Sequence, residues 1–146
     1  MVLLVPNVGR NRGAYGYNFS HYATHMKGAP IHIIRVGLGI TFLWIGVLII
    51  EDPTSWGGLL QPWAAGLLPV PVAQAMYSTA ALDILVGFFL LVDIYTGTAA
   101  LVGLLHLLTV IITVGIDPIT VRDIGLLAAA LALVFAYWPE KRKPLR

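Results

Sequence analysis

The stretch that follows Pro71 reads VAQAMYSTAALDILVGFFLLV (residues 72–92), and its only charged residue is Asp83. A bilayer core about 30 Å thick needs roughly 20 predominantly apolar residues to be spanned by a helix. The stretch has this length and lacks the alternation of apolar and polar residues that a barrel strand shows. Because lipid offers no partner to an unpaired backbone group, we expect these residues to cross a membrane as a helix.

Three further stretches share this character, with approximate bounds of 31–50, 98–116 and 118–138. Only 11% of the 146 residues are charged, against about a quarter in soluble domains. The sequence therefore predicts an all-α fold, an integral-membrane antiparallel four-helix bundle over residues 31–138. We expect residues 1–30 to form a cytoplasmic or interfacial tail and residues 139–146 to form a basic cytoplasmic tail.

The segment between the first two stretches, Glu51 to Pro71, is too apolar for a solvated loop and too rich in glycine and proline for a fifth span. We expect a short helix that lies in the membrane interface or covers the mouth of the bundle, with a wrapped loop as the alternative. Asp52-Pro53 and Asp117-Pro118 have the pattern of a helix N-cap, in which an acid precedes a proline in the first turn.

Lysine and arginine are concentrated at the two ends of the predicted bundle. Eight of the nine basic residues precede or open the first span or follow the last one: Arg10, Arg12, Lys27, Arg35, Lys141, Arg142, Lys143 and Arg146. Basic residues favour the cytoplasmic side, and four spans return the chain to the side on which it started. We therefore expect both termini to be cytoplasmic.

Helices inside lipid associate through close packing of small residues rather than through burial of apolar surface. Each predicted span carries small or polar residues along one face. These are Gly39 and Gly46 in the first span, Thr79, Asp83 and Gly87 in the second, Ala99, Gly103, His106, Val110 and Thr113 in the third, and Ala128, Ala132 and Ala136 in the fourth. We expect these four faces to meet inside the bundle.

Two ionisable residues, Asp83 and His106, lie deep in the predicted spans. At about 1.5 Å per residue, both fall roughly 16 Å below the outer face of the hydrocarbon core, on neighbouring antiparallel helices. We therefore expect their side chains to meet, directly or through one water molecule. One interpretation is a hydrogen-bonded pair that fixes helix register. The other is a proton-accepting site for a quinone or another small redox ligand, because histidine beside a carboxylate exchanges protons near neutral pH.

Two arginines lie at the edges of the predicted spans. Arg122 opens the fourth span, at the height of Glu51 and Asp52. We expect a structural ion pair between Arg122 and Glu51, Asp52 or Asp123, with a site for an anion or a lipid headgroup as the alternative. Arg35 lies near the opposite face, where we expect its long side chain to reach the lipid phosphates.

The composition also limits the cofactors. The absence of cysteine excludes disulfides, thiolate metal sites and cysteine-bound iron–sulfur clusters. His21 and His25 lie one helical turn apart, but no further ligand is clustered with them, so no metal site is predicted. A membrane haem usually needs two facing histidines, whereas a pigment needs one, so His106 as an axial ligand is a weak hypothesis. The basic tails favour anionic lipid over nucleic acid as a partner.

Three motifs resemble a known family: RVGLGITFLWIG (35–46), LDILVGFFLL (82–91) and VRDIGLL (121–127). Through them the chain resembles the DoxX-like family of small bacterial and archaeal membrane proteins, over roughly residues 34–137. The resemblance implies a four-helix subunit of the prokaryotic cytoplasmic membrane, associated in some members with quinone-linked sulfur oxidation or resistance to oxidative stress. The chain departs from the family at Glu51, near which the family often has a lysine, and at Asp83, where glutamate is common.

Four functions follow as hypotheses. The first is a non-catalytic accessory subunit of a larger respiratory or redox assembly, with lipids and other membrane subunits as partners. The second is a small quinone-interacting redox protein that uses Asp83 and His106. The third is a channel or transporter of a small solute, although helices packed through alanine leave little room for a pore. The fourth is a pigment-binding subunit with His106 as the axial ligand.

Overall fold

The structure is a computed structural model in which residues 19–137 are described, with side chains from residue 28 onward. Residues 1–18 and 138–146 of the predicted tails, and the side chains of His21 and His25, lie outside this description. In the described part, no strand occurs and four helices are long and apolar enough to cross a membrane. Their bounds are Phe19–Glu51 (α1), Val72–Val92 (α4), Thr96–Val114 (α5) and Thr120–Tyr137 (α6). The predicted all-helical, multi-pass membrane architecture is confirmed.

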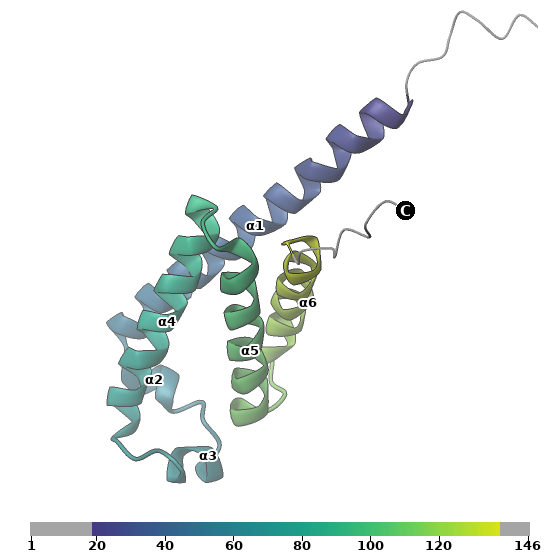
Figure 1. Ribbon diagram of the computed structural model, residues 1–146. Helices are drawn as coiled ribbons and strands as arrows, with labels where there is room; N and C mark the ends of the chain where they lie inside the picture. The colour runs from purple at the N-terminus through teal and green to yellow at the C-terminus, as the bar shows by residue number, and fades with distance from the viewer. Residues whose placement is uncertain (1–18, 138–146) are drawn as a thin grey trace, which may run out of the picture.

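The first helix is longer than the predicted span. Sequence reasoning placed the boundary of the span after Pro30, but Pro30 lies inside α1, which begins at Phe19. At 33 residues α1 is about 50 Å long, more than the thickness of a bilayer core. Figure 1 shows its first turns extending past the ends of the other helices. Residues 19–30 of the predicted tail are therefore a helical extension of the first span.

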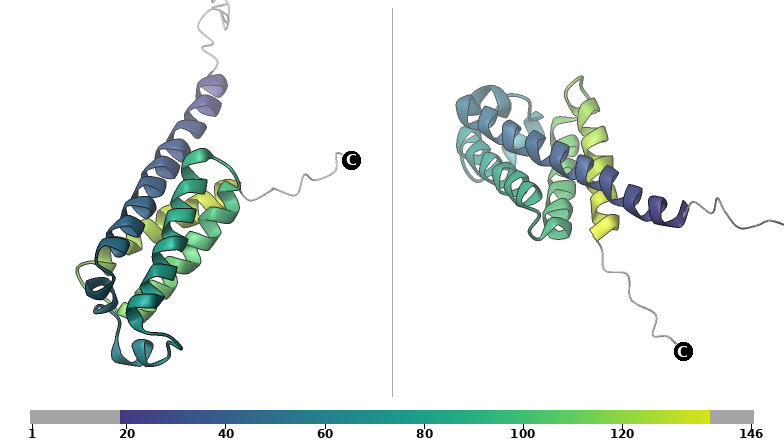
Figure 2. Two further views of the ribbon diagram at one scale, coloured as in Figure 1. Left: turned by 90° about the vertical axis from the view of Figure 1, so that its left-hand side faces the viewer. Right: turned by 90° about the horizontal axis from the view of Figure 1, so that it is seen from above.

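The long helices form two antiparallel pairs, α1 with α4 and α5 with α6. The pairs are joined where α4 turns into α5, and they diverge towards the opposite end (Figures 1 and 2). Two short helices, α2 (Pro53–Gly57) and α3 (Pro62–Gly66), lie at that diverging end. We call the joined end the Asp93 end, after the first residue of the α4–α5 turn, and the diverging end the α2–α3 end.

Glycine permits the closest helix contact in the molecule, between α1 and α4. A Cβ atom on Gly87 would lie 2.6 Å from the backbone nitrogen of Leu43 and 2.7 Å from the carbonyl oxygen of Gly39. A Cβ atom on Gly46 would lie 2.9 Å from the carbonyl oxygen of Ala80. These distances are too short for any side chain, so the predicted small faces of the first two spans do meet.

The predicted small face of the fourth span is wrong. Ala128 and Ala136 are exposed, and no atom lies within 4 Å of a Cβ built on Gly125. The buried face of α6 instead carries larger aliphatic side chains, Leu133 and Val134. They share a core cluster with Ala130 of α6 and with Ala99 and Ala100 of α5, so both helices supply small buried residues, and the one in α6 is Ala130 rather than the predicted alanines. One small residue at each contact suffices, and α6 can then present larger ones.

Both predicted aspartate caps are present. The carboxylate of Asp52 accepts a hydrogen bond of 3.0 Å from the backbone N–H of Ser55, at the start of α2. The carboxylate of Asp117 accepts hydrogen bonds of 2.7 Å from the backbone N–H groups of Ile119 and Thr120, before α6. Hydrogen bonds from the side chain and backbone of Ser55 lower the pKa of the Asp52 carboxyl group below its ordinary value, and those from the backbone N–H groups of Thr120 and Ile119 lower the pKa of Asp117.

The segment between α1 and α4 covers the diverging end of the bundle. The backbone N–H of Gln61 donates a hydrogen bond of 2.9 Å to the carbonyl oxygen of Thr113, and the Gln61 side chain donates one of 3.3 Å to that of Val114. Because these carbonyl groups belong to the last turn of α5, the segment is fixed across the gap between the two helix pairs. Of the sequence-based alternatives, a cover over the bundle mouth is the one observed.

Gly87→Ala should destabilise the protein by about 1–3 kcal/mol, because the added methyl group meets backbone atoms that cannot move aside. Gly125→Ala, the matched control, faces open space and should change the free energy of unfolding by no more than about 0.5 kcal/mol. Thermal unfolding of the purified variants in detergent measures both. Equal stability of the two variants would contradict the close α1–α4 contact.

Candidate functional site

The predicted contact between the two deep ionisable residues is present. His106 Nε2 of α5 lies 3.1 Å from Asp83 Oδ1 of α4, and the side chains are 13% and 3% exposed. Depth along each helix predicted the contact correctly because the α4–α5 turn is short and holds the two helices antiparallel. An imidazole and a carboxylate are thus paired away from either end of the bundle.

The Asp83 carboxylate has an unused acceptor. Its Oδ1 atom lies within ion-pair distance of His106 but in no aligned hydrogen bond with any described residue, although it is fully buried. Buried carboxylate oxygens nearly always accept hydrogen bonds, because leaving one unpaired costs free energy. The charge of this oxygen is therefore balanced mainly by the nearby imidazole of His106.

A cavity of about 620 Å³ begins at this pair and extends towards the α2–α3 end. Its wall is largely apolar and aromatic, with hydroxyl groups at intervals. Its apolar side chains include Phe42, Trp44, Leu48, Trp56, Met76 and Leu107, and its hydroxyl groups belong to Thr41, Thr79, Thr109, Thr113 and Thr120. The volume is within the range of small-molecule sites, about 300–1,000 Å³. Sequence reasoning expected little room inside the bundle and missed this cavity, which the divergence of the two helix pairs creates.

The predicted ion pair of Arg122 is wrong. Among the described residues, no carboxylate oxygen of Glu51, Asp52 or Asp123 lies within 4 Å of the Arg122 side-chain nitrogens. Asp52 caps α2 instead, and Glu51 ends a helix that packs mainly against α4. Arg122 and Asp123 are successive residues of α6 and project about 100° apart. Both line the cavity, Arg122 exposed and Asp123 only 9% exposed.

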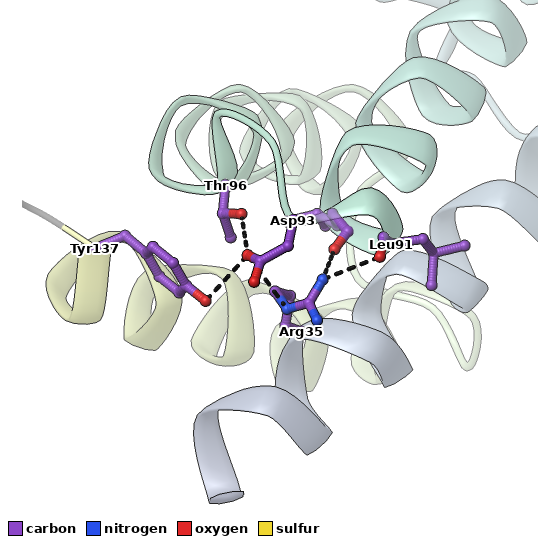
Figure 3. A network of polar contacts seen from close by, with 6 residues as sticks. Arg35, Leu91, Asp93, Thr96 and Tyr137 are labelled. Atoms are coloured by element: carbon purple, nitrogen blue, oxygen red, sulfur yellow. Dashed lines mark hydrogen bonds and ion pairs between the residues drawn. The ribbon is translucent and has the colours of Figure 1, made fainter. Parts of the chain in front are cut away.

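Arg35 forms the second polar site of the bundle, at the Asp93 end (Figure 3). Its Nη1 group donates hydrogen bonds to the carbonyl oxygens of Leu90 and Leu91, the latter 3.1 Å long, and its Nε lies 3.5 Å from Asp93 Oδ1. The same Oδ1 accepts hydrogen bonds of 2.7 Å from the Thr96 hydroxyl and 3.2 Å from the Tyr137 hydroxyl. One network thus joins all four long helices.

This network corrects the expectation that Arg35 reaches lipid phosphates. Arg35 is 8% exposed, and its guanidinium group points inward to the last carbonyl groups of α4, which have no partner within that helix. Asp93 has φ 60°, a left-handed conformation that ends α4 and places its carboxylate beside Arg35. The available signal was an acid directly after a predicted span, level with an arginine on a neighbouring span.

The electrostatics of Asp93 give a pH dependence. The hydrogen bond from Thr96 is the largest cause that lowers the pKa of Asp93, and the charge of Arg35 acts in the same direction. A carboxyl group with a lowered pKa in the folded state stabilises the fold above its unfolded pKa, and this contribution is lost as the pH falls through the folded pKa.

Asp93→Asn should therefore lower Tm by about 2–4 °C near pH 7, and the difference from the wild type should shrink as the pH falls below about 4. Thermal unfolding in detergent across this pH range measures the effect. Glu51→Gln, at an exposed position outside the ion pairs of the described residues, should follow the wild-type profile. A constant difference between Asp93→Asn and the wild type at all pH values would contradict the assignment.

Neither a cluster of metal ligands among the described residues nor a comparison with known proteins helps to assign the site. In the part of the chain with described side chains, no three of the histidine, aspartate and glutamate residues are grouped so that they could hold a metal ion. No protein-family model matches the chain, and neither a curated protein nor a solved structure matches it. The functional argument therefore depends on the cavity and on the two residues at its inner end.

Proposed function

We propose that this chain is a quinone-binding subunit of a membrane redox assembly, with the ligand in the cavity between the two helix pairs. The observation that carries the proposal is the buried Asp83–His106 pair on the cavity wall. A quinone is a flat apolar ring with carbonyl acceptors. It suits a largely apolar wall with one ionisable pair.

The cavity also has a route for a ligand that is dissolved in lipid. Trp44 of α1 lines the cavity and is 63% exposed at the surface. Thr109 of α5 also lines the cavity and is exposed. The cavity wall therefore reaches the outer surface of the bundle, where acyl chains would surround it. A quinone with an isoprenoid tail could place its ring at the pair and leave its tail in the bilayer.

The pair supplies proton chemistry. Reduction of a quinone to a quinol takes up two electrons and two protons. Protonated His106 can donate a ring N–H proton to a quinone oxygen, so that the N–H bond breaks, the O–H bond forms and the ring becomes neutral. Reprotonation of the ring from water then supplies the second proton. Asp83 stabilises the imidazolium form before transfer. The electrons come from a partner subunit that carries a flavin, a haem or an iron–sulfur cluster.

The other functional hypotheses gain less support. The inner end of the cavity borders a buried apolar layer that includes Leu90 and Leu133, which argues against a continuous channel. Nε2 of His106 is occupied by Asp83, which argues against its use as an axial ligand for a pigment. An accessory role within an assembly agrees with the helical extension of α1, which offers a partner surface beyond the bundle (Figure 1).

The cellular setting belongs to the same proposal. The DoxX-like motifs support placement in a prokaryotic cytoplasmic membrane. The concentration of basic residues at both ends of the chain supports an orientation with both termini in the cytoplasm. The α2–α3 end would then lie at the outer face of the membrane.

The proposal predicts a quinone-binding phenotype for the pair. Purified wild-type protein should bind a short-chain ubiquinone and quench the fluorescence of Trp44 and Trp56, which line the cavity. His106→Gln should weaken the binding of this ubiquinone about tenfold or more, because the imidazole N–H donor is replaced by an amide that cannot carry a proton to the quinone. Asp83→Asn should keep the fold and lose the proton uptake that accompanies reduction of the bound quinone, measured with a pH indicator and a chemical reductant.

Tyr137→Phe is the matched control, since Tyr137 belongs to the polar network at the other end of the bundle and does not line the cavity. It should bind the quinone like the wild type. Equal quinone affinity in His106→Gln and the wild type, or no binding by the wild type, would refute the proposed function.

A further inference from the structure

The cavity is closed on one side by apolar packing. Between the Asp83–His106 pair and the Asp93 end lies a layer of buried side chains from all four long helices. Its members are Leu38 of α1, Val86 and Leu90 of α4, Ala99 and Ala100 of α5, and Ala130 and Leu133 of α6. Leu90, Ala100, Ala130 and Leu133 are 0% exposed. Water has no polar partner in this layer, so it is dry.

A second barrier lies beyond that layer. The Arg35 network connects the four helices at the Asp93 end, where Oδ1 of Asp93 contacts Arg35, Thr96 and Tyr137 (Figure 3). No residue of this network lines the cavity. The helix pairs are therefore held together on the side where the cavity ends.

The opposite side of the cavity carries polar groups. Asp123 and Arg122 line it from α6, and Thr113 and Thr120 line it near the α2–α3 end. Asp123 accepts no hydrogen bond or ion pair from a described residue, and its charge interacts most with that of Arg122 and less with those of Asp117, Asp83 and His106. A space of this size with several polar partners can hold water.

We infer that the Asp83–His106 pair exchanges water and protons with only the side of the membrane on which α2 and α3 lie, through a passage lined by Asp123 and Arg122. The titratable groups that face this passage are Asp83 from α4, His106 from α5, and Arg122 and Asp123 from α6. The lining residues from α1, α2 and α3 are uncharged. The direction of proton uptake on quinone reduction rests on the proposed function, whereas the access route does not.

The natural absence of cysteine makes this route measurable. Single-cysteine variants are treated with a charged, membrane-impermeant methanethiosulfonate reagent in intact cells and in inside-out vesicles. Thr79→Cys and Thr113→Cys place the thiol on the cavity wall. Thr54→Cys of α2 and Ile94→Cys of the α4–α5 turn mark the two sides of the membrane, and Leu105→Cys, on the exposed apolar surface of α5, is the lipid-facing control.

Both cavity thiols should react in the same preparation as Thr54→Cys and stay unreacted in the preparation that labels Ile94→Cys. Leu105→Cys, one residue from His106, should react in neither. Labelling of a folded cavity variant from the Ile94 side, or failure of both cavity variants to react from the Thr54 side, would overturn the inference. The second cavity position protects the test against loss of folding in the first.

The charges of the passage give an independent readout. In the Thr79→Cys background, the ratio of labelling rates for a cationic and an anionic reagent of similar size should fall about fivefold on Asp123→Asn. Arg122→Gln should raise the same ratio, because it removes a positive charge from the same passage. If the ratio of labelling rates is unchanged in both variants, Asp123 and Arg122 do not line the route by which the reagents reach the cavity.

These measurements use no quinone. One-sided labelling together with absent quinone binding would refute the proposed function and leave the access route intact. Quinone binding together with labelling from both sides would refute the access route and leave the proposed function intact.

Discussion

The contact between Arg35 and the last carbonyl groups of α4 is the interaction on which the arrangement of the helices depends. A buried guanidinium group is costly unless it meets acceptors, and the end of a helix is a place where carbonyl groups lack partners. Asp93 supplies the countercharge, and Thr96 and Tyr137 bring the other helix pair to the same atom. The two pairs are thereby held together by a charged network at one end, whereas at the other end the described residues join them through the hydrogen bonds of Gln61.

This asymmetry explains why a small bundle contains a large cavity. Gly39 and Gly87 bring α1 and α4 into backbone contact, so each pair is tight internally. Between the pairs, contact is close from the Asp93 end to the level of Asp83 and His106. Beyond that level, Gln61 connects the segment after α1 with the end of α5 across the gap. The cavity is thus a consequence of how two rigid pairs are fastened, rather than of any one bulky or missing side chain.

The sequence predicted what depends on distance along a helix and missed what depends on rotation about it. The level of Asp83 and His106 follows from a fixed rise per residue, and their contact was predicted correctly. The partners of Arg35 and Arg122 were missed because they depend on which way each helix face turns, which no single span reveals. The prediction that the alanines of α6 face the bundle interior failed for the same reason, since any of several faces of an apolar helix could turn inward.

The two polar sites of the bundle differ in a way that bears on function. In the Arg35 network, Oδ1 of Asp93 contacts Arg35, Thr96 and Tyr137, as a site that only holds helices together requires. The Asp83–His106 pair is more deeply placed and borders a cavity. Each site leaves one buried atom without an aligned hydrogen bond, Arg35 Nε in the first and Asp83 Oδ1 in the second, so the cavity is what distinguishes them. A pair that served helix register alone would be expected to close around its charges, because an unpaired buried carboxylate oxygen costs free energy and the cavity forfeits packing. A bound molecule with a hydrogen-bond donor or an exchangeable proton would offset both costs.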